Sequence, residues 1–300
     1  MEKFVCNRFN RKKKLGRGGF GIVYIAEDTV TKETLALKKI MVRSPKDGIE
    51  YHAIQEIRQL NELQHPNIVK FNGVFTHKFT LYLSTEYLPY ELIHLFNKYP
   101  DHKLPINIVK CVMKGVLQAL SYMHNSKIMH RDIKPDNVLF DKNGVPKLID
   151  FGLSCDFPSD FGPMICQATT LNYRAPELLF SQNNYGSEID MWSTGAMFAE
   201  LLLGKPIFDA PNDIHLLSQI AKTLGTIEWS GCEKIRAYMK FSAPEGFSIS
   251  TFDDKFKEFG NDALSLLKSL LVLDPSKRIT ADEALKHPFL SDAPDFISFE

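Results

Sequence analysis

Two carboxylates, an amide and a lysine stand close together in the middle of the chain: Asp132, Lys134, Asn137 and Asp150. A carboxylate can orient a hydroxyl group, whereas a carboxylate and an amide together suit a hard cation that prefers oxygen ligands. These residue types at this spacing are typical of metal-assisted phosphoryl transfer.

A predicted hairpin brings Asp150 back beside Asp132. Val138–Phe140 and Lys147–Ile149 read as short strands, and the dipeptide Asn143-Gly144 between them tolerates the positive φ of a tight turn. The chain reversal therefore gathers the four polar groups at one place.

A glycine-rich segment precedes them, in the pattern Gly16-x-Gly18-x-x-Gly21-x-Val23. Glycines let backbone amides close over phosphates without interference from a Cβ atom. The same spacing occurs in dinucleotide-binding turns, but those open into a helix. Here Ile22–Ile25 is β-branched and aromatic, which predicts a strand. A phosphate-covering hairpin is therefore favoured.

A lysine and a glutamate are predicted to pair close to the phosphate-covering hairpin. Lys38 lies on a predicted strand, on the same face as Ala36, where its ammonium group can reach a nucleotide. Glu56 lies on a predicted helix, within the inward-facing stripe that includes Ala53 and Ile57. Because a carboxylate on such a stripe is costly unless it finds a cation, we predict an ion pair between Glu56 and Lys38.

The predicted secondary structure changes near Leu88-Pro89. Before this point the segments are short and strand-like, with one helix, whereas long helical patterns dominate after it. We predict an α+β protein with a small β-rich lobe, residues 1–88, and a larger mainly helical lobe, residues 89–300. At the junction, a nucleotide base is expected to bond to backbone groups of Glu86 and Leu88. The helices predicted in the larger lobe are Pro105–His124, Ser187–Leu203, Asn261–Leu273 and Thr280–His287.

Composition argues against several classes of function. The chain has 36 basic and 36 acidic residues, so its balanced charge gives no reason to expect nucleic acid or a membrane as a partner. The basic run Arg11–Lys14 is interpreted as a solvated strand face. No apolar run approaches the ~20 residues that a membrane span needs. The five cysteines are scattered, without Cys-x-x-Cys, which predicts a reducing, intracellular compartment and no zinc site.

Taken together, these residues resemble the eukaryotic-type protein kinases over essentially the whole chain. The resemblance implies the two-lobed kinase fold, with ATP and Mg²⁺ as cofactors. The motifs that carry it are the glycine loop, Lys38, Glu56, His130–Asn137, Asp150–Gly152, Ala175-Pro176-Glu177, Asp190–Gly195 and Arg278.

The resemblance also implies roles for the central polar residues. Lys38 would orient the α- and β-phosphates, and Asp132 would accept or orient the proton of the substrate hydroxyl. Asn137 and Asp150 would hold Mg²⁺. The residues implied to surround the nucleotide are Gly16, Arg17, Gly18, Gly19, Phe20, Gly21, Val23, Ala36, Lys38, Thr85, Glu86, Leu88 and Leu139.

Further positions match the serine/threonine branch of the family. Lys134, two residues after the catalytic aspartate, would steady the γ-phosphate, and Thr170 would contact that aspartate. Glu177 and Arg278 resemble the buried ion pair that braces the large lobe.

Within the kinases, the resemblance is to cyclin-dependent kinases. Arg174, in Tyr173–Glu177, matches the arginine that shapes a pocket for proline after the phosphoacceptor. The segments that resemble the CDK-activating, TFIIH-associated subgroup are Lys46–Ile49 with Ala53–Ile57, Asn143–Val145, Glu177–Phe180 and Leu201–Leu203.

This likeness implies partners and a location. A cyclin would bind the helix containing Glu56, and a third assembly subunit is left open. The substrate would be a protein with Ser/Thr-Pro sites, either the C-terminal repeat of RNA polymerase II or the activation loop of another kinase. The family also implies nuclear residence, with the cytoplasm as an alternative.

Several positions depart from the family pattern. Family members commonly switch on when three arginines capture a phosphorylated threonine. Aligned backwards from Arg174, the phosphothreonine position is Ile165. Two arginine positions hold Gln55 and Cys155, and only Arg131 remains. Since the acceptor and two of its clamps are missing together, we predict that the active loop is held without phosphorylation, by packing of Ile165 and by a partner.

Three more departures concern binding and regulation. Thr85 stands where a bulky aromatic residue usually closes the space behind the adenine, which predicts an open pocket. Asn172 replaces the tryptophan usual before Tyr-Arg, at the substrate-docking surface. Gly19-Phe20 stands where cell-cycle members carry an inhibitory Thr-Tyr pair, so inhibition through this pair is expected to be absent.

Two other functions remain open. A cyclin-independent kinase of the MAP-kinase type would keep the chemistry, but the activation segment holds no Thr-x-Tyr. For the CDK-activating subgroup, the assembly is less firmly implied than the fold, because the short tail after Pro288 lacks the extension typical of that subgroup. A pseudokinase scaffold would keep the fold without the chemistry, and it is disfavoured by the intact set Lys38, Glu56, Asp132, Asn137 and Asp150.

Overall fold

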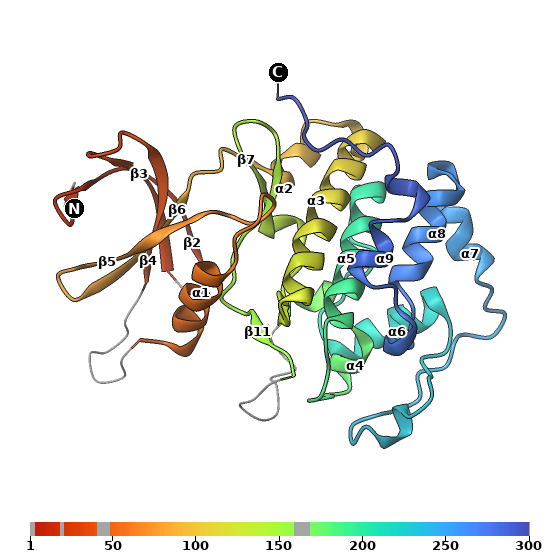
Figure 1. The fold of residues 1–300 in the computed structure, drawn as a ribbon. Coiled ribbons are helices and arrows are strands. Elements are labelled where there is room, and N and C mark those ends of the chain that lie inside the picture. The colour runs from red at the N-terminus through yellow and green to blue at the C-terminus, as the bar shows by residue number, and fades with distance from the viewer. Residues whose placement is uncertain (1–3, 19–20, 41–48, 159–168, 300) are drawn as a thin grey trace.

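A six-stranded antiparallel sheet forms the N-terminal part of the molecule, in the order β1-β2-β3-β4-β6-β5 (Figure 1). The structure, a computed structural model, describes residues 4–18, 21–40, 49–158 and 169–299. The strands of this sheet are β1 (Phe4–Val5), β2 (Phe9–Gly18), β3 (Gly21–Asp28), β4 (Thr34–Ile40), β5 (Phe71–His77) and β6 (Thr80–Glu86).

The register of the central strands gathers one face of this sheet into a wall. Val23 pairs with Lys38, which pairs with Leu83, and Ala36 pairs with Thr85. Directly opposed residues of antiparallel strands point to the same face, and residues two apart on one strand also share it. All five side chains therefore lie together, as predicted for Ala36 and Lys38. The opposite face carries a separate small core of Val5, Phe9, Ala26, Leu35, Leu37 and Tyr82.

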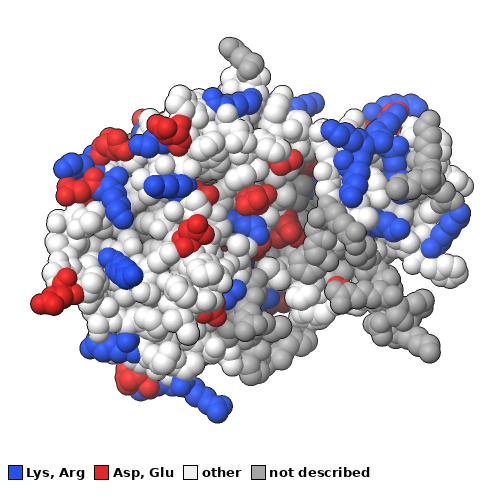
Figure 2. Space-filling view, turned by 180° about the vertical axis from the view of Figure 1, so that it is seen from behind, with Lys and Arg blue, Asp and Glu red and all other residues white. Residues whose placement is uncertain are grey.

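The basic run of β2 lies on the surface. Lys12, Lys13 and Lys14 are exposed, and the guanidinium group of Arg11 lies 4.9 Å from the ring centre of Tyr24. Lys and Arg side chains gather over the sheet at the right of Figure 2, whereas both signs of charge are interspersed over the helical part. The interpretation of this run as a solvated strand face is confirmed.

Helix α1 (Tyr51–Glu62) follows β4 in the chain and lies beside the sheet (Figure 1). Its buried side includes Ala53, Glu56 and Leu60, spaced three and four residues apart. The predicted inward-facing stripe is therefore present, with a carboxylate in the middle of it.

Helices form most of the rest of the molecule, and α3 and α5 lie at its centre. Every residue of α5 from Ile189 to Leu202 is buried, because this segment is apolar nearly all round. The helices are α2 (Leu92–Phe96), α3 (Ile106–Asn125), α4 (Pro176–Leu179), α5 (Glu188–Leu203), α6 (Asp213–Leu224), α7 (Ser250–Phe256), α8 (Asn261–Leu270) and α9 (Ala281–Ala284). The predicted α+β fold, with a small β-rich lobe followed by a larger mainly helical lobe, is confirmed.

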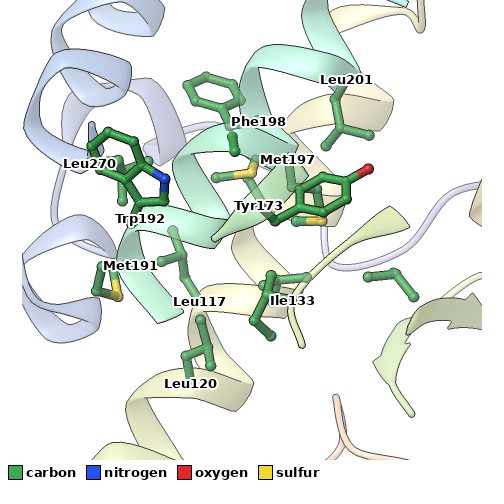
Figure 3. Packing of buried hydrophobic residues seen from close by; sticks show 14 of the residues in the cluster. Leu117, Leu120, Ile133, Tyr173, Met191, Trp192, Met197, Phe198, Leu201 and Leu270 are labelled. Atoms are coloured by element: carbon green, nitrogen blue, oxygen red, sulfur yellow. The ribbon is translucent and has the colours of Figure 1, made fainter. Parts of the chain in front are cut away.

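Large side chains of α5 pack against its two neighbours. Figure 3 shows Trp192 and Phe198 of α5 beside Leu270 of α8, with Leu117 of α3 on another side. A Cβ atom on Gly195 would lie 2.8 Å from the Cβ of Leu270, so a glycine is needed for α8 to approach this closely.

The predicted helix bounds differ from the observed ones mainly at the C-terminal end of the chain. Thr280–His287 was expected to be one helix, but α9 is only Ala281–Ala284, begun by a capping box between Thr280 and Glu283. Helix α8 ends at Leu270 rather than Leu273.

One helical stretch, Pro100–Asn125, is long and apolar enough to cross a membrane by length and composition alone. Within its most apolar window, however, 61% is buried inside the protein, because α3 packs against α5 and α9. It is the central helix of a folded core.

The predicted hairpin is formed by β9 (Val138–Phe140) and β10 (Pro146–Leu148), which ends one residue earlier than expected. Only Gly144 of the predicted turn dipeptide has a positive φ, 81°, and a Cβ atom there would collide with the carbonyl of Ile297. The remaining short strands are β7 (Tyr90–Glu91), which pairs with β9, and β8 (Ile128–Met129) with β11 (Cys155–Asp156).

Candidate active site

A cleft of about 570 Å³ lies between the inner face of the sheet, helix α1 and the β9–β10 hairpin. Its wall includes eight of the residues predicted to surround a nucleotide: Gly21, Val23, Ala36, Lys38, Thr85, Glu86, Leu88 and Leu139. It also includes residues that the sequence did not single out for this role: Leu15, Leu60, Val69, Leu83, Tyr87, Ile149, Leu153 and Thr169.

The glycine segment is only partly described. Gly16 and Gly18 lie on β2, opposite Val23 and Gly21. Gly21 approaches the next strand closely, since a Cβ atom there would lie 2.3 Å from the carbonyl oxygen of Lys39. The backbone of Arg17 is part of β2. The predicted nucleotide contacts Gly19 and Phe20 lie outside the described residues.

The predicted ion pair between sheet and helix is present. Nζ of Lys38 lies 2.6 Å from Oε1 and 2.7 Å from Oε2 of Glu56, and 3.5 Å from Oδ1 of Asp150. Burial alone would lower the pKa of Lys38, but the two carboxylates outweigh it and the pKa is raised. Lys38 therefore stays charged at the side of the cleft where the phosphates of a nucleotide would lie.

The carboxylate of Asp132 is surrounded by donors. Oδ1 accepts hydrogen bonds from the hydroxyl of Thr170 at 2.6 Å and from its backbone N–H at 3.2 Å. Oδ2 lies 2.7 Å from Nζ of Lys134 and accepts from the amide of Asn137 at 2.9 Å. Burial works in the opposite direction, but Lys134 and Thr170 prevail and lower the pKa of Asp132. Asp132 is thus an oriented, ionised acceptor.

Asn137 and Asp150 are the two residues that suit a hard cation. Oδ1 of Asp150 is buried and has no hydrogen-bond partner at bonding distance, although the ammonium group of Lys38 is near. An oxygen left in this state fits a cation that takes carboxylate and amide ligands and completes its shell with phosphate oxygens and water. Asp150 also has φ 61°, a conformation that is rare outside turns and functional sites.

No other group of side chains in the described ranges resembles a metal centre. No three His, Cys, Asp or Glu residues gather there in a way that could hold a metal ion.

A buried aspartate holds the loop that carries Asp132. Both oxygens of Asp190 accept backbone N–H groups, from His130 at 2.9 Å and from Arg131 at 2.8 Å. Nε2 of His124 lies 3.0 Å from the same carboxylate. His124 lies in the last turn of α3, and its contact with Asp190, 66 residues further along the chain, has no local signal in the sequence.

The activation segment departs from a phosphate-dependent arrangement as far as it is described. Nε of Arg131 donates to the carbonyl of Leu153 at 2.5 Å, and Nη1 donates to the hydroxyl of Tyr185 at 3.0 Å. Gln55 donates to the hydroxyl of Tyr51, and Cys155 lies on β11. Ile165, the position aligned with the phosphothreonine, lies outside the described residues.

The predicted brace of the large lobe is fully buried. Nη1 and Nη2 of Arg278 donate to the two carboxylate oxygens of Glu177 at 2.5 and 2.7 Å, and both side chains have no exposed surface. The guanidinium carbon of Arg278 lies 5.0 Å from the ring centre of Trp192. This pair is structural, because it lies outside the cleft.

Comparison with known proteins identifies the family of the chain. The protein kinase domain family matches residues 9–290. "Cyclin-dependent kinase C-2" of Oryza sativa subsp. japonica is 37% identical over 298 residues, covering 92% of this chain and 58% of the relative. "Cyclin-dependent kinase C-1" of the same plant is 36% identical over 307 residues, covering 95% of this chain and 59% of the relative.

The chain thus spans somewhat less than three fifths of the length of these curated relatives. The match nevertheless includes the cleft, the hairpin and the activation segment. The chain belongs to the protein kinase family, and its relatives support the cyclin-dependent branch of that family.

Proposed function

We propose that this protein transfers the γ-phosphoryl group of ATP to serine or threonine hydroxyls of proteins, at sites followed by proline. The observation that carries the proposal is that the oriented carboxylate of Asp132 and the Lys38–Glu56 ion pair lie in one cleft. A scaffold without chemistry would need neither an ionised, donor-saturated Asp132 nor a charged lysine that is held in place.

Each polar residue has a part in the proposed reaction. Lys38 binds and orients the α- and β-phosphates, while Asp132 accepts the hydrogen bond of the substrate hydroxyl and directs it toward the phosphorus. Lys134, 2.7 Å from Asp132, donates to the transferred phosphoryl group. Asn137 and Asp150 hold Mg²⁺, which when bound neutralises charge that develops on the phosphate oxygens.

The surroundings of Arg174 support specificity for proline after the phosphoacceptor. Nη2 of Arg174 donates to the backbone carbonyl of Thr169 at 2.7 Å, and Nη1 forms an ion pair with Asp213 at 3.0 Å. The carbonyl that precedes Thr170 is therefore already engaged by a cation. A following residue of the substrate that brings no N–H donor, namely proline, suits such a surface.

Helix α1 supports the proposal of a cyclin partner. Ile49, Tyr51 and Ile54, at and just before its first turn, are 43%, 58% and 50% exposed. Apolar side chains gathered on one side of a helix indicate a protein surface that is covered in a complex. A cyclin bound here would act directly on the element that carries Glu56.

The finer assignments are also part of the proposal. We retain the C-terminal repeat of RNA polymerase II or another kinase's activation loop as the substrate, and the nucleus as the location. The CDK-activating subgroup and a third assembly subunit remain predictions, since the relatives named above are cyclin-dependent kinases of the C type.

The test is phosphoryl transfer from ATP and Mg²⁺ to a Ser-Pro repeat peptide, by the purified chain alone and with a candidate cyclin. Asp150→Ala, which removes a proposed metal ligand, is the control that must be inactive. Turnover that depends on the cyclin supports the proposal. Turnover by the chain alone removes the cyclin from it, and silence of the complex on this and generic peptides overturns it.

A further inference from the structure

The face of helix α1 that supplies Glu56 also touches the start of the activation segment at two points. His52, Glu56 and Gln59 are four and three residues apart, so they lie on one side of the helix. One turn before Glu56, Nδ1 of His52 lies 3.0 Å from the carbonyl oxygen of Gly152. One turn after it, Nε2 of Gln59 donates to Oδ1 of Asp156 at 3.4 Å. The position of Glu56 is therefore bracketed by these contacts.

A second side chain of α1 holds the same carboxylate. Nη1 of Arg58 lies 2.9 Å from Oδ2 of Asp156, so each oxygen of Asp156 faces a donor from the helix. The side chains of Arg58 and Asp156 are 43% and 30% exposed, and such an ion pair alone contributes little. Gln59, in contrast, is fully buried, so its amide meets the charged acceptor from a position away from water.

The amide of Gln59 depends on this contact for its orientation. Its Oε1 is buried and has no hydrogen-bond partner within the described part of the chain. Buried polar atoms almost always have a hydrogen-bond partner, so the contact with Asp156 is what keeps this amide from being wholly unsatisfied. The donor end of Gln59 points at Asp156, which lies on β11 in the described start of the activation segment.

Asp156 supplies a permanent negative charge in a segment whose phosphate clamp is incomplete. Gln55 and Cys155 stand at two of the positions where arginines would capture a phosphate. Arg58, one turn along the helix from Gln55, reaches Asp156 instead. A carboxylate needs no modifying enzyme, so this contact is present as soon as the chain folds.

We propose that Asp156 is a positioning residue: a built-in carboxylate that binds Arg58 and Gln59 and so keeps Glu56 of the same helix paired with Lys38. The proposal rests on the kinase activity proposed above and names the contact that maintains its active arrangement. Loss of the contact releases α1 from the activation segment, and the phosphates of the nucleotide lose their orientation.

The test compares Asp156→Ala with Glu62→Ala in the full chain, assayed with its cyclin on the Ser-Pro peptide. Glu62 is the matched control because it is the other carboxylate that binds Arg58, 3.2 Å from its Nε, and it ends helix α1 at the surface. Asp156→Ala is expected to lower kcat about tenfold, with the KM for the peptide nearly unchanged. Glu62→Ala is expected to stay within about twofold of the native protein.

A charge exchange separates positioning from general damage to the fold. Arg58→Asp together with Asp156→Arg keeps an ion pair at the same place, and the new guanidinium group can donate to Oε1 of Gln59. This double variant is expected to recover kcat to within about threefold of the native value. If the exchange recovers nothing while the native thermal stability is kept, the proposal is wrong.

Amide hydrogen exchange of residues 51–62 gives a readout that does not depend on catalysis. Asp156→Ala should exchange faster than the native chain over this helix, whereas Glu62→Ala should differ only in its last turn. If the variants differ in exchange as described but the native chain transfers no phosphate, the proposed function is refuted and the positioning role of Asp156 stands. Equal exchange and equal kcat in the two single variants would refute the positioning role of Asp156.

Discussion

The hydroxyl of Thr170 lies 2.6 Å from Oδ1 of Asp132 and donates to it, so the activation segment itself supplies a ligand to the proposed catalytic carboxylate. Nζ of Lys134 lies 2.7 Å from the same hydroxyl oxygen, which it bonds as a donor. These bonds fix the plane of the carboxylate before any substrate arrives. They tie the placement of the segment to the orientation of Asp132.

Thr170→Val should therefore lower kcat by about ten- to a hundredfold, because one hydrogen bond to a charged group is lost while the volume is kept. Thr170→Ser retains the hydroxyl and should keep most of the activity. The measurement is steady-state kinetics on the Ser-Pro peptide, with thermal denaturation to show that both variants fold. Equal kcat values for the two variants would argue against this role.

Thr85 on the wall of the cleft predicts selective binding of inhibitors. It lies opposite Ala36 on the sheet, and Leu60, Val69 and Leu83 line the same cleft with it. A phenylalanine at this position would fill that space. Thr85→Phe should weaken inhibitors with a bulky group behind the adenine by about tenfold or more, because the two groups would overlap.

The control for this prediction is chemical as well as genetic. Parent inhibitors without the bulky group should bind Thr85→Phe almost as well as the native protein, and Thr85→Val should bind both series normally. Inhibition constants for the two series settle the matter. If the bulky series binds Thr85→Phe unchanged, the space behind the adenine is not bounded by residue 85.

The Glu177–Arg278 pair should dominate the stability of the larger lobe. Glu177→Ala leaves a guanidinium group that has no exposed surface without its carboxylate, and such a loss typically costs about 3–5 kcal/mol. Urea denaturation measures the free energy of unfolding. Asp254→Ala, which removes the exposed partner of Lys257, is the control and should change stability by no more than about 0.5 kcal/mol. Similar losses for both variants would contradict this account.

The Arg8–Asp28 pair predicts a specific pH dependence of stability. The Arg8 guanidinium, 2.6 Å from the buried Asp28 carboxylate, lowers the pKa of that carboxyl to about 2. In the unfolded chain the pKa is about 4, so the folded state binds fewer protons between these values. The stabilisation is complete above about pH 5 and is lost as the pH falls through about 4 toward 2.

Asp28→Asn tests this sign. The difference in the free energy of unfolding between the native chain and the variant should be constant from about pH 7 to pH 5 and should shrink by about pH 3. Urea denaturation at each pH gives the difference, in which the titration of other carboxyls cancels. A difference that grows on acidification would contradict the prediction.

The sequence predicted elements whose pattern is strong and local. Helices α3 and α5 begin within one residue of the predicted Pro105 and Ser187, because apolar spacing over four or more turns leaves little choice. The pairing of Lys38 with Glu56 followed from a carboxylate on a buried stripe. The length of helix α9 was overestimated, because the amphipathic spacing of the sequence continues past Ala284, although the helix ends there.

Contacts between distant residues could not be predicted in this way. Asp156 meets Gln59 across 97 residues, and His124 meets Asp190 across 66. Taken singly, Gln59, Asp156 and His124 look like ordinary surface or helix-end polar groups, and the motif that contains Asp190 does not identify its partner. Only the fold brings them together, since neither lies in a recurring spacing that a single sequence reveals.

The last prediction is that activity does not require phosphorylation of the activation segment. Arg131 is already bonded to the carbonyl of Leu153 and the hydroxyl of Tyr185. Thr169 is 4% exposed, and the hydroxyl of Thr170 is bonded to Asp132, so neither hydroxyl is presented to another kinase. Phosphatase treatment of the purified complex should therefore leave kcat within about twofold of its starting value.

Tyr185→Phe extends this prediction, because it removes an acceptor from Arg131 without opening a cavity. It should lower kcat several-fold, less than Thr170→Val does, because Arg131 keeps its bond to the carbonyl of Leu153, and the loss should not depend on phosphatase treatment. Mass spectrometry of the active complex completes the test. Stoichiometric phosphate on Ser159, Thr169 or Thr170, with activity that disappears when it is removed, would show that a phosphate does what we assign to these internal bonds.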